Sequence, residues 1–166
     1  PLIEILNKCI QTKQKYFCLS RPRRFGKSVT AQMLCSYYSR GEDSSSQFDS
    51  LKIAKSPSYK KHLNQYNVIF INMSLEFNSA RHDVNQMISS VTSSIVKELK
   101  EAYPQVVFNS PNKLYESLDD VFSDSKVPFV FIIDEWDRIM REKKEDAQSL
   151  KLYLEWLEGI FKDQSY

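Results

Sequence analysis

Residues 16–28 read YFCLSRPRRFGKS: a short apolar run, an arginine-rich loop, and then Gly-Lys-Ser at the start of a helical pattern. Residues 16–20 predict a buried strand, and the apolar spacing from Lys27 predicts a helix that ends near Gly41. A strand that leads through a loop to a helix N-terminus gathers backbone N–H groups and the positive end of the helix dipole. The stretch therefore predicts a phosphate-binding loop.

A second segment makes this interpretation much more specific than Gly-Lys-Ser alone, which recurs by chance. Residues 129–135 read FVFIIDE, an apolar strand that ends in two carboxylates. Ligands of parallel sheets bind at the carboxyl ends of the strands, so we expect the loop and the two carboxylates at one edge.

These residue types suit phosphoryl transfer, which needs charge neutralisation, a held metal and an aimed nucleophile. Lys27 would place a charge on the β- and γ-phosphates, and the N–H groups of residues 25–29 would cradle them. Ser28 directly, and Asp134 through a coordinated water, would hold Mg²⁺, and Glu135 would polarise the attacking water. Two adjacent carboxylates repel each other unless a cation is near, which fits a metal site.

A simpler interpretation stays open for each of these groups. Asp134 and Glu135 could end a strand and cap the next element, and Lys27 and Ser28 could be an exposed helix start. Arg21, Arg23 and Arg24 could clamp phosphate, dock another segment or be solvated.

The rest of the chain alternates strands and helices, which predicts a parallel α/β sheet covered on both faces. The expected strands are residues 67–74 and 127–134, and the expected helices are residues 2–14, 84–103, 111–123 and 149–161, with a polar loop at 41–50. The apolar stripe of the first helix is Leu2, Ile5, Leu6, Cys9 and Ile10, and that of the last is Leu150, Leu154, Leu157 and Phe161.

Composition indicates one folded domain of 166 residues with 42% hydrophobic residues and a net charge of +2. Residues 1–40 carry eight Lys or Arg and one acid, which favours an anionic ligand there. Cys9, Cys18 and Cys35 are expected to be reduced core residues of a cytoplasmic protein, and no apolar run approaches a membrane span. The chain begins at Pro1 inside a helical pattern, so we expect it to be part of a longer protein.

The segments SRPRRFGKS, FDSLKIA, VIFINMS and FIIDEWD resemble the AAA-ATPase-like family of P-loop NTPases, and the similarity spans nearly the whole chain. The resemblance implies that Gly26, Lys27 and Ser28 form a Walker A motif. The ATP contacts expected around it are Arg23, Arg24, Phe25, Gly26, Lys27, Ser28 and Val29. It also implies a Walker B motif in which Asp134 serves Mg²⁺ and Glu135 is the catalytic glutamate. Arg21, in place of the first glycine of the usual motif, is typical of this family.

The resemblance further implies a three-layer parallel sheet of the ASCE type with helices on both faces. Members usually continue into further strands and a region that resembles PD-(D/E)xK nucleases, and neither is present in this sequence. Residues 1–166 are therefore expected to be the N-terminal part of a single domain, truncated after the Walker B strand and the following helix. The missing strand normally lies between the first and third strands, so hydrolysis is expected of the full-length protein rather than of this chain alone.

The leading hypothesis is Mg²⁺-dependent ATP binding and hydrolysis coupled to a conformational change in a larger protein. One alternative is a nucleotide-gated regulatory module with little turnover. Another is a module associated with nucleic acid, which salt-dependent binding to DNA or RNA would support. No membrane partner is expected, and the oligomeric state is left open.

Overall fold

The computed structural model describes residues 2–10, 12–20 and 26–161 of the chain. It divides into two compact units, the first made of Pro1–Phe70 and Val130–Ile132 and the second of Ile71–Phe129 and Ile133–Tyr166. Among the described residues, no helix has both the length and the apolar character needed to cross a bilayer.

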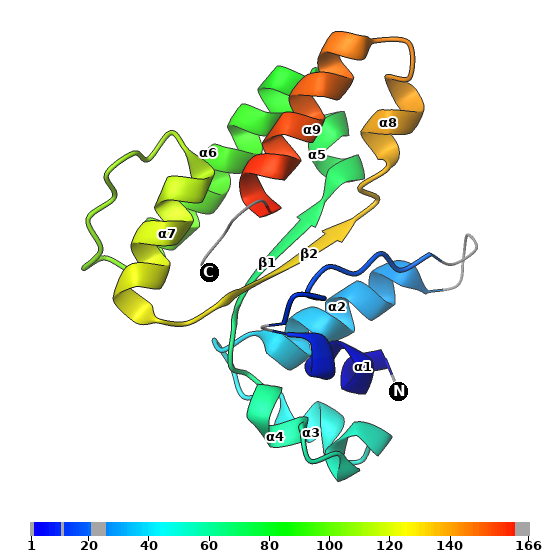
Figure 1. Cartoon of the computed structure of the whole chain (residues 1–166), viewed down its shortest axis with the longest axis vertical. Coiled ribbons are helices and arrows are strands. Elements are labelled where there is room, and N and C mark those ends of the chain that lie inside the picture. The colour runs from blue at the N-terminus through cyan, green and yellow to red at the C-terminus, as the bar shows by residue number, and fades with distance from the viewer. Residues whose placement is uncertain (1, 11, 21–25, 162–166) are drawn as a thin grey trace. The chain divides into compact units, whose positions relative to one another are not determined.

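The described sheet consists of two parallel strands, β1 (Asn67–Asn72) and β2 (Phe129–Asp134), which run side by side in Figure 1. Both are rich in β-branched and aromatic residues, as strands of a covered sheet are. These are the two strands expected around residues 67–74 and 127–134, and with the helices they confirm an α/β fold.

The strand expected at residues 16–20 is absent: these residues have no regular secondary structure, are exposed and lie outside the sheet. Tyr16, Phe17 and Leu19 are 57%, 45% and 43% exposed, and Cys18 is exposed rather than a core residue. A short apolar run becomes a strand only when another strand satisfies its N–H and C=O groups. In the described residues β1 and β2 pair with each other, and neither strand pairs with residues 16–20.

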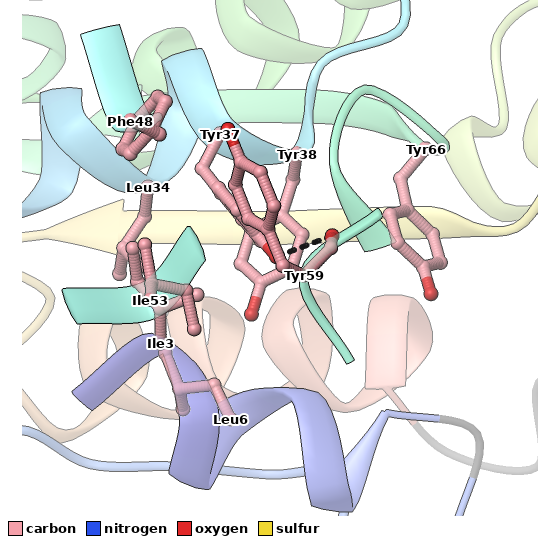
Figure 2. Packing of buried hydrophobic residues seen from close by; sticks show 9 residues of the cluster. All are labelled: Ile3, Leu6, Leu34, Tyr37, Tyr38, Phe48, Ile53, Tyr59 and Tyr66. Carbon is pink, nitrogen blue, oxygen red and sulfur yellow. Dashed lines mark hydrogen bonds between the residues drawn. The ribbon is translucent and has the colours of Figure 1, made fainter. Parts of the chain in front are cut away.

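The first unit contains α1 (Leu2–Cys9), α2 (Lys27–Tyr38), α3 (Ser45–Phe48), the 3₁₀ helix η1 (Lys52–Lys55) and α4 (Tyr59–His62). Its core is a cluster of aliphatic and aromatic side chains, namely Ile3, Leu6, Leu34, Tyr37, Tyr38, Phe48, Ile53, Tyr59 and Tyr66 (Figure 2). The rings meet edge to face, with centroids 4.9 Å apart for Tyr37 and Tyr38 and 5.2 Å for Tyr37 and Phe48. Val68, Val130 and Ile132 pack against this cluster, so these parts of the strands belong to the same core.

Buried polar groups in this aromatic core are hydrogen-bonded. Asn7 accepts from the Tyr38 hydroxyl at 2.9 Å and donates to the Tyr37 hydroxyl at 3.1 Å. The Tyr37 hydroxyl in turn donates to the Tyr59 carbonyl at 2.9 Å, the bond drawn in Figure 2. Burial raises the pKa of Tyr38 well above its ordinary value, so its hydroxyl stays a neutral donor.

The second unit contains α5 (Met73–Ser79), α6 (Val84–Ala102), α7 (Leu114–Ser125), α8 (Arg138–Glu142) and α9 (Ala147–Phe161). Figure 1 shows α6, α7 and α9 packed side by side. The long helix α6 lies where its sequence pattern predicts. Asp83 caps its start by accepting a hydrogen bond from the Gln86 N–H at 2.9 Å. Its apolar stripe is buried and consists of Val84, Met87, Val91, Ile95, Val96 and Leu99.

Some expected boundaries and faces are wrong. β1 ends at Asn72, where the Asn side chain accepts from the Leu75 N–H at 3.1 Å and starts α5, so residues 73–74 are helical. In α9 the buried residues are Tyr153 and Ile160, while Leu154 is 42% exposed. In α1, which ends at Cys9, Ile5 is 54% exposed because Ile3, Leu6 and Asn7 face the core.

Candidate functional site

The Gly-Lys-Ser segment forms a helix start. Gly26 is the N-cap of α2, with φ 69° and ψ 30° in the left-handed region, which glycine adopts without a Cβ penalty. A Cβ added to Gly26 would meet no atom within 4 Å, so the backbone conformation and not space requires glycine. Lys27 is half-buried, whereas Ser28 and Val29 are exposed, Val29 at 69%.

This helix start has the backbone geometry that an anion needs. The first four N–H groups of an α-helix lack intrahelical acceptors and lie at the positive end of the dipole. The Thr30 N–H and hydroxyl both bond to the Gly26 carbonyl at 2.9 Å, which fixes the first turn. Arg23, Arg24 and Phe25, and Arg21 with them, lie outside the described residues, so their proposed phosphate contacts stay predictions.

Asp134 is the last residue of β2 and is only 7% exposed. Its Oδ1 accepts from the Glu135 N–H at 3.0 Å, so the carboxylate bends back over the chain that leaves the strand. A buried carboxylate needs hydrogen bonds or a cation to offset its desolvation. Asp134 thus presents a buried, hydrogen-bonded carboxylate at the carboxyl end of β2.

Glu135 has a left-handed backbone, with φ 55°, which is uncommon for a residue with a Cβ. This conformation turns the chain from β2 toward α8, and the Arg138 N–H closes the turn on the Glu135 carbonyl at 2.9 Å. Its side chain is paired, because Arg141 Nη2 lies 2.9 Å from Glu135 Oε2.

Arg141 is a residue at this site that the sequence did not single out. It also contacts Asp137, with 3.1 Å between Nε and Oδ2. The i,i+4 spacing of Asp137 and Arg141 is a readable signal for that second pair. The contact with Glu135 carries no such signal, because it depends on the left-handed turn.

The structure places the two predicted halves of the site in different units. Gly26, Lys27 and Ser28 belong to the first unit, and Asp134 and Glu135 belong to the second. Their convergence on one triphosphate stays a prediction. Within the described part of the chain, no three His, Cys, Asp or Glu side chains gather as a metal site.

A family model with the description "Predicted AAA-ATPase" matches residues 5–164. Neither the curated proteins nor the solved structures contain a match to this chain. Since the matched range includes the Gly-Lys-Ser helix start, β1 and the acidic end of β2, the chain belongs to the AAA-ATPase-like family.

Proposed function

We propose that this chain is the nucleotide-binding part of a Mg²⁺-dependent ATPase that couples hydrolysis to a conformational change in a larger protein. The observation that carries the proposal is the glycine-capped start of α2, with Lys27 and Ser28 as its first residues, in a member of the AAA-ATPase-like family. In the full-length protein we expect a three-layer sheet that brings this helix start to the end of β2.

Lys27 and the backbone N–H groups of the first turn would bind the triphosphate. The turn supplies donors and a positive dipole end, and Lys27 adds a full charge on the β- and γ-phosphates. The exposed Ser28 and Val29 leave this turn accessible to a ligand.

The residues present fit Mg²⁺, which prefers oxygen ligands and keeps several waters. Ser28 offers a hydroxyl and Asp134 a fixed, buried carboxylate. When bound, the cation would neutralise charge on the phosphates.

Glu135 would polarise the attacking water. It follows the metal carboxylate directly and keeps its side chain at the surface, 35% exposed, where water can reach it. Proton acceptance by a placed carboxylate contributes typically about 10²–10⁴-fold to a rate.

Two variants in the full-length protein test this proposal. Lys27→Ala is expected to weaken Mg²⁺–ATP binding by roughly tenfold or more, because it removes a charge-assisted phosphate contact. The matched control is Lys13→Ala, which removes an exposed lysine outside the site. Calorimetric titration that gives equal affinities for the two variants would contradict the phosphate site.

Glu135→Gln is expected to keep ATP affinity and to lower turnover by about 10²-fold or more. Full turnover in this variant would remove the assigned role of Glu135. Tight binding with no measurable turnover in the wild type would instead identify a nucleotide-gated module.

A further inference from the structure

One guanidinium joins the two acidic side chains that follow β2. Arg141 Nη2 lies 2.9 Å from Glu135 Oε2, and Arg141 Nε lies 3.1 Å from Asp137 Oδ2. Because a guanidinium presents its donors in a rigid plane, contacts through two of its nitrogens fix its orientation. Asp137 therefore aims Arg141, and Arg141 holds the Glu135 carboxylate.

The helix that carries Arg141 is well anchored although it is short. Ile139 is fully buried, and Glu142 pairs both with Arg138 and with His82, whose Nδ1 lies 3.0 Å from Glu142 Oε2. On the other side of the turn, the Tyr153 hydroxyl of α9 donates to the Trp136 carbonyl at 2.7 Å. The Glu135–Arg141 ion pair thus lies between two anchored segments, α8 and the turn that contains Trp136.

The backbone of Glu135 adds a second constraint on the same side chain. A residue with a Cβ adopts the left-handed region at an energetic cost that glycine does not have, and such strain concentrates at functional positions. The left-handed turn sets the direction of the Cα–Cβ bond, and Arg141 sets the far end of the side chain. Together they restrict Glu135 to a small part of its conformational range.

We propose that Arg141 is the positioning residue for Glu135, an inference that rests on the proposed function of Glu135 in polarising the attacking water. Arg141 acts through the Glu135 carboxylate that it contacts. Loss of Arg141 frees the carboxylate to sample other rotamers, so the water is aimed for a smaller fraction of the time. Binding of ATP does not depend on this orientation, and the effect falls on turnover.

The test compares Arg141→Ala with the wild type in steady-state ATP hydrolysis by the full-length protein. We expect kcat to fall roughly three- to tenfold, the range of a half-exposed ion pair that holds a catalytic group, with KM unchanged within about twofold. Arg141→Lys, which keeps the charge and loses the planar fork, should restore part of the lost kcat. Lys144→Ala, which removes an exposed positive charge shortly after α8, should behave as the wild type.

Three results would overturn the inference: an unchanged kcat in Arg141→Ala, an increased kcat, or a loss expressed mainly in KM. A purely structural role would lower the fraction of active enzyme without a partial rescue by lysine. The double variant of Glu135→Gln with Arg141→Ala should be no slower than Glu135→Gln alone.

The outcomes separate this inference from the proposed function. Normal turnover in Glu135→Gln removes both proposals. Lost turnover in Glu135→Gln with normal turnover in Arg141→Ala removes only the positioning role.

Discussion

Asn7 is the polar residue whose replacement best tests the packing of the first unit. Its side chain joins α1 to α2 through a hydrogen bond from the Tyr38 hydroxyl at 2.9 Å and one to the Tyr37 hydroxyl at 3.1 Å, and it donates to Ser58 Oγ at 3.1 Å. Asn7 and Tyr38 are 4% and 2% exposed, so water cannot replace these bonds without rearrangement. We choose Asn7→Leu, which keeps the shape of the side chain and removes its polar atoms.

The expected loss follows from the groups left behind. The buried Tyr38 hydroxyl loses its acceptor, at about 1–3 kcal/mol, whereas Tyr37 still donates to the Tyr59 carbonyl. With the weaker loss of the Ser58 contact, Asn7→Leu should lower the free energy of unfolding by about 2–4 kcal/mol. Tyr38→Phe should cost about 1–2 kcal/mol, because it leaves the Asn7 oxygen without this donor.

The double variant decides whether the hydrogen bond is the cause. Asn7→Leu with Tyr38→Phe removes both partners, so it should be more stable than the sum of the single losses by about 1–2 kcal/mol. Urea unfolding followed by circular dichroism measures the four free energies of this cycle. Losses that add to within about 0.5 kcal/mol would refute the reasoning, since independent sites add in that way.

Two further predictions concern the backbone and pH. Lys126 ends α7 with φ 56°, so Lys126→Gly should raise the free energy of unfolding by about 0.5–1 kcal/mol in urea unfolding, whereas Lys126→Ala, which keeps a Cβ, should give no gain. Burial, and to a smaller extent Lys61, lowers the pKa of His62 below its ordinary 6.5, so the unfolded chain binds the proton first as the pH falls. The free energy of unfolding should therefore decrease as the pH falls from about 6.5 to the lower pKa of the folded state. The His62→Gln variant should lose this part of the pH dependence, and urea unfolding curves at several pH values would measure the difference. The same pH dependence in His62→Gln and in the wild type would contradict the assignment.

The sequence predicted those helices and strands best whose apolar pattern is long or whose end carries a cap or charged residues. The existence and face of α6 were predictable because its apolar stripe repeats over five turns and Asp83 caps its start. β2 was predictable because a continuous apolar run meets two carboxylates. Helix α9 was predicted but with the wrong buried face, since apolar residues surround it and only packing selects Tyr153 and Ile160.

The remaining features depend on partners that sequence patterns do not specify. Residues 16–20 have strand composition, yet a strand exists only beside another strand, and the described sheet pairs β1 with β2. The pairing of Glu135 with Arg141 needs a left-handed glutamate, a conformation that glycine or asparagine would signal and glutamate does not. The left-handed conformation of Gly26, in contrast, was predictable, because a glycine directly before a helical pattern signals such a residue at the helix start.

The distribution of aromatic residues gives each compact unit its own optical signal. Both tryptophans, Trp136 and Trp156, belong to the second unit, while the tightly packed rings of Tyr37, Tyr38, Tyr59 and Tyr66 belong to the first. Tryptophan emission therefore reports on one unit, and the near-ultraviolet dichroism of immobilised tyrosines is weighted toward the other. Recorded on one sample, the two signals would reveal whether the units melt together or in sequence.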